Sequence, residues 1–163
     1  MSFNPKSEAL RRRMLTPWRF RFYLWTTLPL AAGAGLRLRE LDGSSCTVFL
    51  PGGWRTQNPF RSTYFAAQAM AAELSTGAPA AVLVAGASAS VSMLVRGISA
   101  VFTQKIVGGS LFTFSDVAGM GTAIERSAGG GAGETYVARA TGRTPEGTLA
   151  AEFEITWSFK RRG

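Results

Sequence analysis

One carboxylate interrupts the most apolar stretch of this sequence. The run Asn58–Gly77 reads NPFRSTYFAAQAMAAELSTG, and from Tyr64 to Leu74 only Gln68 and Glu73 break a series of aromatic, alanine and methionine residues. This composition predicts a helix that is apolar almost all round, and such a helix is normally buried. A buried carboxylate must be paired, protonated or functional, because an isolated charge is costly away from water. Glu73 is therefore the first candidate for chemistry.

The residue types that are missing narrow that chemistry. The sequence contains no histidine and a single cysteine, Cys46. Without histidine, the chain cannot build a Ser-His-Asp or Cys-His triad or a histidine metal site. One cysteine forms neither an intrachain disulfide nor a Cys-x-x-Cys zinc site, so no metal is expected. Cys46 is expected to be a small core residue, and a single free cysteine fits a reducing cytoplasm.

Length and composition favour a single globular domain with a basic surface. The domain is expected to span residues 1–163, and 46% hydrophobic content argues against disorder. The net charge is +8, and 15 of the 18 basic residues are arginine. This balance suits phosphate-bearing partners such as coenzyme A, although an arginine-biased genome produces the same balance. Nucleic-acid binding is not expected, because the arginines look scattered and not clustered with aromatic residues.

Residues 1–30 are interpreted as an N-terminal helical extension. Arg11-Arg12-Arg13 followed by the apolar run Phe22–Ala32 resembles a signal peptide. Two arginines immediately before the run, and a proline and two threonines within it, argue against that interpretation. The run is also too short to cross a bilayer, so no membrane span is expected. The expected helices are Ser7–Leu15, with Ser7 as its N-cap, and Pro17–Leu28.

Strand patterns flank the apolar helix. In Leu36–Leu50, leucines alternate with arginines and Asp42-Gly43 is a strong turn signal, which predicts a hairpin. Alternate residues from Phe153 to Phe159 are apolar, which predicts a half-buried final strand. The other expected elements are strands at Val91–Gln104, Gly109–Phe114, Gly133–Thr141 and Thr148–Lys160, and a helix at Val117–Ser127 capped by Asp116.

This order predicts an α+β domain in which an antiparallel sheet of about six strands wraps one helix, residues 62–77. Ser62 or Thr63 is expected to cap that helix. Gly77 is expected to end it, because glycine is common just beyond helix C-termini. Pro79 is expected to begin a second, short helix that ends near residue 89.

Four segments resemble one family of known proteins. They are Asn58–Phe65, Ala71–Gly77, Val91–Val95 and Trp157–Arg161. Together they are similar to the DUF4442 family of hotdog-fold proteins, which are relatives of the PaaI-type acyl-CoA thioesterases. The resemblance covers about Leu28–Arg162 and implies the hotdog fold, a sheet curled around a central helix. Activity follows less directly, because one fold hosts thioesterases, dehydratases and non-catalytic acyl-CoA sensors.

The resemblance implies a place for the chemistry. Hotdog thioesterases use an acidic residue on the central helix as base or nucleophile, and a backbone N–H at the helix N-terminus as oxyanion donor. Glu73 and the backbone N–H of Phe65 match these positions. Eight residues separate them, roughly 12 Å at about 1.5 Å per residue, so one thioester carbonyl cannot reach both. The site is therefore expected to need a homodimer with antiparallel central helices, or a tetramer built from such dimers.

Further residues are candidates for substrate contact, and each has a structural alternative. Asn58 is expected to hydrogen-bond the substrate carbonyl or a water, or else to organise its loop. Arg61 is expected to meet a phosphate of coenzyme A near the helix N-terminus, or else to be a solvated charge. Gln68 is a candidate ligand or a helix-to-sheet hydrogen bonder. Ser62 is placed on the helix face that carries Glu73, and Tyr64 either lines an acyl tunnel or packs in the core.

Two functions from different classes remain. The first is an acyl-CoA thioesterase, with the coenzyme A thioester as substrate and no further cofactor. The second is a non-catalytic acyl-CoA or fatty-acid binding protein. The sequence departs from many PaaI-type enzymes because Tyr64 and Phe65 stand where those enzymes carry a His-Gly-Gly segment. A hotdog dehydratase is not expected, because those sites use a histidine with an acid.

Overall fold

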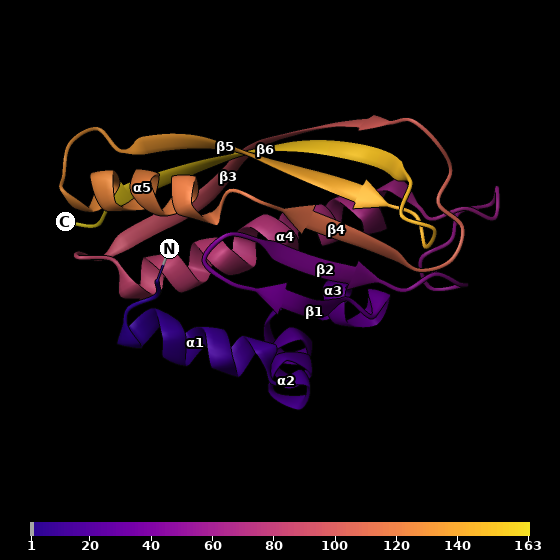
Figure 1. Ribbon diagram of the computed structural model, residues 1–163, viewed down its shortest axis with the longest axis horizontal. Coiled ribbons are helices and arrows are strands. Elements are labelled where there is room, and N and C mark those ends of the chain that lie inside the picture. Colours follow the sequence, from indigo (N-terminus) through magenta and orange to yellow (C-terminus); the bar gives the residue numbers. More distant parts are fainter. Residues whose placement is uncertain (1) are drawn as a thin grey trace.

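The computed structural model describes residues 2–163 and shows one curved sheet with its helices on the concave side and at one end (Figure 1). The N-terminal half contains α1 (Pro5–Leu15), α2 (Pro17–Thr27), α3 (Pro29–Ala34), β1 (Arg37–Leu41), β2 (Cys46–Leu50) and α4 (Phe65–Gly86). The C-terminal half contains β3 (Val91–Phe102), β4 (Ser110–Phe114), α5 (Val117–Ala128), β5 (Glu134–Arg143) and β6 (Leu149–Arg161).

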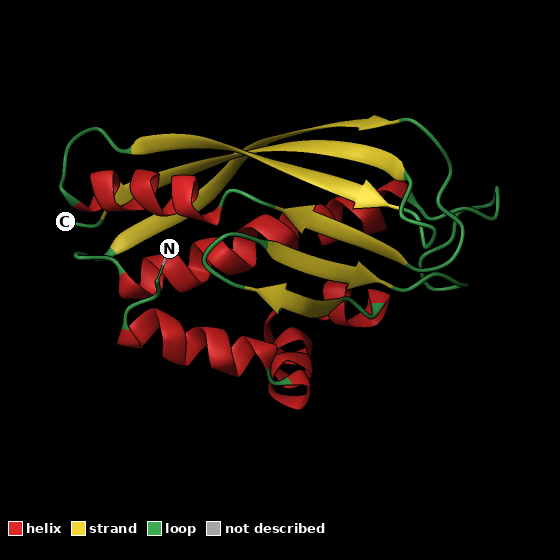
Figure 2. Ribbon diagram, viewed as in Figure 1, coloured by secondary structure: helices red, strands yellow, loops and turns green. Residues whose placement is uncertain are grey.

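The six strands form one antiparallel sheet in the order β1-β2-β4-β5-β6-β3 (Figure 2). β1 and β3 are therefore the two edges, and α4 runs along the sheet between them. This arrangement is the hotdog fold, and it confirms the α+β architecture that the strand patterns predicted. The pairing of β3 with β6 shifts register between Val95 and Gly97, which marks a β-bulge or irregularity in this edge strand.

The core forms where small residues of α4 meet large residues of the sheet. Alternate residues of β6, from Phe153 through Ile155 to Phe159, are buried as the period-two pattern predicted. Facing them, α4 contributes small buried residues such as Ala71 and Ala72, which let the helix approach the sheet closely. Cys46 is fully buried in β2, and burial raises the pKa of its thiol, so it is a core residue as predicted.

The central helix differs from its prediction at both ends. It begins at Phe65, after Tyr64 as N-cap, so Ser62 and Thr63 neither lie in the helix nor cap it. It also continues through Gly77 and Pro79 to Gly86, in place of two shorter helices. Pro79 removes one backbone donor from the helix, at a cost that isolated helices rarely tolerate.

Tertiary packing explains why α4 continues beyond Pro79. Residues Ala78–Ala80 are buried, and α1 packs alongside the C-terminal half of α4 (Figure 1). Ser7 Oγ donates a hydrogen bond of 2.7 Å to the Val82 carbonyl, and Asn4 Nδ2 donates one of 2.6 Å to the Gly86 carbonyl. These contacts offset the local penalty, because burial routinely overrides helix propensity.

The N-terminal helices form as expected, with two corrections. Asn4 caps α1 by accepting from the Ser7 backbone N–H at 3.0 Å, so Ser7 is not the cap. Pro29 ends α2 and opens a further short helix, α3, which the sequence did not predict. Figure 1 shows α2 projecting from the body of the domain next to β1.

Within residues 2–163, α4 is the single helix that is long and apolar enough to cross a membrane by length and composition. In the fold, 56% of its apolar window is buried. Its apolar surface is therefore used largely by the sheet and α1, as in the core helix of a domain.

Candidate active site

Asn58 organises the loop that leads into α4. Its Oδ1 accepts hydrogen bonds from the Phe60 backbone N–H at 3.0 Å, and from the Ser62 backbone N–H and Oγ, both at 3.2 Å. Arg61, in the middle of this tight turn, adopts a left-handed backbone with φ of 59° and an exposed side chain. The Asn58 oxygen is thus occupied by its own loop, and its Nδ2 is the group that remains for a ligand.

The N-terminus of α4 is held by the backbone and by Gln68. The Tyr64 N–H donates to the Thr56 carbonyl at 2.7 Å, and no side chain caps the helix. Gln68 is buried, and its Nε2 donates to the Thr63 carbonyl at 3.1 Å. Its Oε1 has no partner among the described residues. Gln68 therefore fixes the loop to the helix and has one free acceptor.

The first amides of α4 are free to bind an oxyanion. Tyr64 accepts from the N–H groups of Ala67 and Gln68. In residues 2–163, the N–H groups of Phe65 and Ala66 have no acceptor, as expected for the first turn of a helix. The positive end of the helix dipole lies at this position and favours negative charge.

Exposed aromatic side chains occur next to these free amides, at Tyr64 and Phe65, and on the preceding loop, at Phe60. The rings of Tyr64 and Phe65 meet edge to face, with centroids 4.8 Å apart. An exposed aromatic cluster of this kind is typical of surfaces that bind a ligand or a partner, because single-chain folding leaves it uncovered.

Glu73 lies two turns further along α4 and is half-buried. In the part of the chain that the structure describes, its carboxylate has neither a hydrogen bond nor an ion pair. Desolvation by burial raises the pKa of this carboxyl above the ordinary value of 4.5. An unpaired carboxyl with a raised pKa is suited to general acid–base catalysis near neutral pH.

Gly77 makes room for that carboxylate. A Cβ at Gly77 would lie 3.0 Å from Glu73 Oε1 and 3.4 Å from the Trp157 ring. Trp157 Nε1 donates to Thr76 Oγ1 at 3.0 Å, and Thr76 Oγ1 donates to the Glu73 carbonyl at 2.9 Å. The sequence did not predict that Gly77, Thr76 and Trp157 contribute to the site. The available signal was a glycine inside a helix, one turn after an acid.

Glu73 occupies the middle of a half-exposed face of α4, which we call the Glu73 face. Its spacing follows the helical repeat, so its members share one side of the helix. Most of them are small, which leaves space beside the carboxylate. The Glu73 face consists of Ala66, Ala69, Met70, Glu73, Gly77 and Ala81.

The structure brings some predicted site residues together and separates others. Asn58, Ser62, Tyr64, Phe65 and Gln68 gather at the N-terminus of α4, with Arg61 on the same loop. Glu73 lies eight residues from Phe65, roughly 12 Å along the axis at about 1.5 Å per residue. Within a single chain, the carboxylate and the free amides therefore lie too far apart to contact one carbonyl group. No group of three or more acidic or cysteine side chains that suits a metal ion occurs in residues 2–163.

The six-stranded sheet that curves around α4 defines a hotdog domain, and comparisons with known proteins agree. Residues 16–159 match the family described as a domain of unknown function, DUF4442, and the chain belongs to this family. No curated protein matches the sequence.

Solved structures with the same fold are distant in sequence. A Pseudomonas aeruginosa protein described as a probable thioesterase superposes with a TM-score of 0.75 at 19% identity, over 92% of this chain and 99% of that one. A Haemophilus influenzae thioesterase gives a TM-score of 0.66 at 14% identity, over 90% of this chain and 91% of that one. A Chlorobaculum tepidum protein of unknown function gives 0.71 at 13% identity, over 91% and 99%. At these identities the similarity establishes the fold.

Proposed function

We propose that this protein is a thioesterase that hydrolyses an acyl-CoA thioester at a site shared by two copies of the chain. The observation that carries the proposal is Glu73, an unpaired, half-buried carboxyl with a raised pKa on the open face of the central helix. The free N–H of Phe65 at the N-terminus of the same helix supplies the complementary group. Solved neighbours described as thioesterases support the reaction class.

In the proposed reaction, the Glu73 carboxylate takes a proton from a water molecule, whose oxygen attacks the thioester carbonyl carbon. The negative charge that develops on the carbonyl oxygen is stabilised by the Phe65 N–H and the dipole of α4. The C–S bond then breaks, and Glu73 returns the proton to the departing thiolate. The products are a carboxylic acid and free coenzyme A. Direct attack by Glu73, through an acyl-enzyme anhydride that water then cleaves, is the other route open to this carboxylate.

Two copies are required because the two groups are too far apart in one. The exposed core-side residues of β3 support a second copy at this edge. Ile98 and Phe102 pair with buried residues of β6 and so share the face that packs on α4. They are nevertheless 48% and 45% exposed, respectively. A homodimer formed along β3 covers them and places two α4 helices side by side, antiparallel, with the Glu73 of one near the Phe65 of the other.

The remaining site residues are assigned to substrate binding. Arg61, which has no ion-pair partner among the described residues, contacts a phosphate of coenzyme A. Asn58 Nδ2 positions the carbonyl or the attacking water, with Ser62 behind it. Tyr64 lines the acyl chain, and Gln68 Oε1 accepts from the substrate. The substrate is its own source of coenzyme A, no further cofactor is needed, and a reducing cytoplasm is the proposed compartment.

A binding protein without catalysis is the second candidate. The observation that favours it is the crowding at the Phe65 amide, where the ring centroids of Tyr64 and Phe65 lie 4.8 Å apart and no glycine opens the approach. In that case the aromatic residues bind an acyl-CoA, and Glu73 takes no part in any reaction.

Hydrolysis of a panel of acyl-CoA substrates, short, long and aromatic, by the wild type and Glu73→Gln separates these candidates. For a thioesterase, we expect turnover with at least one substrate, and a loss of about 10²–10⁴-fold in kcat for the variant with ligand binding retained. For a binding protein, no substrate turns over and both proteins bind acyl-CoA equally. Unchanged turnover in Glu73→Gln would contradict the assigned role of this carboxylate.

A further inference from the structure

The solvent-facing side of α2 carries an aromatic stripe, formed by Trp18, Phe22 and Trp25. The spacing i, i+4, i+7 places all three on one face of the helix. They are 68%, 69% and 53% exposed, respectively. The opposite face of α2, with Phe20 and Leu24, is buried against the domain. α2 is therefore apolar on two sides, and the fold uses only one of them.

Arginines flank this stripe, and most of them have no acidic partner. Residues 9–39 contain seven arginines and no aspartate or glutamate. Arg11 and Arg12 pair with Glu8, and the other five form no ion pair within the described residues. Arg21 and Arg19 lie on either side of the stripe by helical spacing. Arg19 lies over the Trp18 ring, and Arg37 and Arg39 lie over the Phe49 ring, so here arginines do cluster with aromatic residues.

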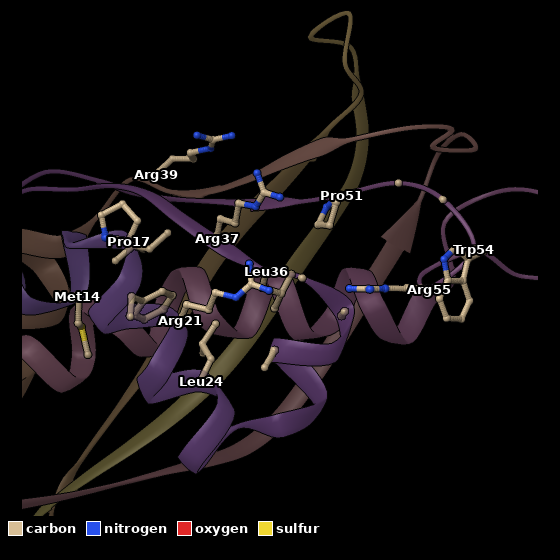
Figure 3. Close-up of a pocket in the computed structure, with 17 residues that line it drawn as sticks. Met14, Pro17, Arg21, Leu24, Leu36, Arg37, Arg39, Pro51, Trp54 and Arg55 are labelled. Carbon is tan, nitrogen blue, oxygen red and sulfur yellow. The ribbon is translucent and has the colours of Figure 1, made fainter.

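A basic hollow of about 690 Å³ lies between α2, α3 and β1, on the side of α2 away from the stripe, and Arg21 belongs to its lining. Figure 3 shows Arg21, Arg37, Arg39 and Arg55 around it, with the guanidinium groups of Arg21 and Arg55 pointing toward one another near Leu36. The floor is apolar, and no acidic residue lines the hollow. Guanidinium groups over an apolar floor suit a phosphate attached to hydrocarbon.

We infer that α2 is a membrane-docking helix, which lies in the interface of an anionic phospholipid bilayer with its aromatic stripe inserted and its flanking arginines on the lipid phosphates. Tryptophan and phenylalanine next to arginine on one exposed helix are what the bilayer interface selects. With 11 residues, α2 is too short to span a bilayer, so it rests in the interface plane.

Shape and charge favour a bilayer over other occupants. α2 projects from the domain as a ridge (Figure 1), which inserts into a fluid interface without a matching groove. A second copy of the chain is disfavoured, because it would bring two sets of unpaired arginines together. β1 and β3 are opposite edges of the sheet, so the docking helix stays free in the dimer proposed above. The inference does not depend on hydrolysis.

Vesicle flotation with the full chain tests this inference. We expect the wild type to float with phosphatidylcholine vesicles that contain about 30 mol% phosphatidylglycerol, and to stay behind with phosphatidylcholine alone. About 0.5 M NaCl should weaken the binding, because salt screens the arginines. Replacing Trp18, Phe22 and Trp25 by serine should weaken it by about tenfold or more, with an unchanged melting temperature because the side chains are exposed.

Two charge-matched double variants give an independent readout. One is Arg19→Glu with Arg21→Glu, and the other is Arg161→Glu with Arg162→Glu. Each lowers the net charge of +8 by four, because every exchange replaces a positive charge by a negative one. Only the first pair, on α2, should abolish flotation.

Quenching of tryptophan fluorescence by brominated lipid then reports insertion directly. In a Trp54→Phe background, Trp18 and Trp25 should be quenched while the buried Trp157 is not.

Four results would overturn the inference. Two concern flotation: no flotation with anionic vesicles, or an equal loss of flotation in both charge-reversed double variants. The other two are stripe-dependent association of the chain without lipid, and stripe-dependent retention on single-stranded DNA without quenching by lipid.

Discussion

Trp157 and Glu73 are joined through Thr76, because the indole donates to the Thr76 hydroxyl at 3.0 Å and that hydroxyl donates to the Glu73 carbonyl at 2.9 Å. Glu73 Oε1 and the same indole both lie beside Gly77, 3.0 Å and 3.4 Å from where a Cβ would stand. A residue of the final strand thus fixes the turn of α4 that carries the carboxyl, and a glycine leaves it space. The position of the acid depends on β6 as much as on its own helix.

Gly77→Ala should separate stability from activity. Alanine is a better helix former than glycine by about 0.5–1 kcal/mol, so the free energy of unfolding should stay level or rise. The new methyl group would lie 3.0 Å from Glu73 Oε1, so the carboxylate must move. Because small misplacements of a catalytic group are costly, kcat/KM should fall about tenfold or more.

Gly33→Ala in α3 is the matched control for that variant, because no atom lies within 4 Å of its added methyl group. It should gain helix propensity and leave kcat/KM unchanged. Urea unfolding and acyl-CoA hydrolysis measure the two properties. Full activity in Gly77→Ala would show that the carboxylate does not need its present place.

The pH dependence of the protein should report the raised pKa of Glu73. Because the ionised form is the base, kcat/KM should rise with pH through a midpoint above 4.5. Stability should respond in the opposite direction. A folded-state pKa above the unfolded value adds stability at low pH, and this is lost as pH rises through the folded pKa.

Glu73→Gln removes that titration and makes the linkage measurable. The variant should melt higher than the wild type at about pH 8, and the difference should vanish near pH 4, below the ordinary glutamate value. Melting curves across this range provide the check. A lower melting temperature of the variant at pH 8 would mean that the carboxylate has a stabilising partner in the assembled protein.

Local patterns in the sequence predicted the elements whose stability is local. Alternation gave β6, and Asp116 caps α5 by accepting from the Gly119 N–H, as its position suggested. The predicted end of α4 at Gly77 was wrong, because the contacts that hold the rest of the helix come from the segment around α1, far away in sequence. No rule of local propensity includes such contacts.

In the candidate site, too, features set by the local sequence were predicted and features set by distant contacts were not. The half-buried, unpaired position of Glu73 was readable from one acid in an apolar run, whereas its catalytic role remains a proposal. The predicted capping of α4 by Ser62 or Thr63 was wrong. The start of the helix is held by the Thr56 carbonyl and the Gln68 side chain, and Ser62 hydrogen-bonds Asn58 instead. Trp157 was assigned to the core by its alternation, and its hydrogen bond to Thr76 depends on how β6 crosses the helix.

Ile98→Asp should dissociate the proposed dimer. Ile98 lies on the edge strand β3 and faces the α4 side of the sheet, yet remains 48% exposed. A carboxylate buried there in a dimer would be unpaired, which typically costs several kcal/mol. We expect a monomer by sedimentation, and a loss of hydrolysis because the shared site is gone. Val137→Asp, on the exposed face of the interior strand β5, should remain dimeric and active.

Mixing two inactive variants should restore activity if the site is shared. Glu73→Gln removes the base, and Phe65→Pro removes the backbone N–H of the first helical residue. Proline is well tolerated at that position, and the extended backbone of Tyr64, with ψ of 135°, suits a residue before proline. Phe65→Ala keeps the N–H while it removes the ring, so it should retain far more activity than Phe65→Pro.

Refolding the two variants together at equal concentration produces about half heterodimers. Each heterodimer has one site with both defects and one with neither, because each site takes Glu73 from one copy and the Phe65 N–H from the other. We expect about a quarter of wild-type kcat in the mixture, and almost none in either variant alone. If the two groups instead served a site within one chain, every site would keep a defect and mixing would restore nothing. The mixture therefore distinguishes a shared site from a self-contained one, even where both assemblies are dimers.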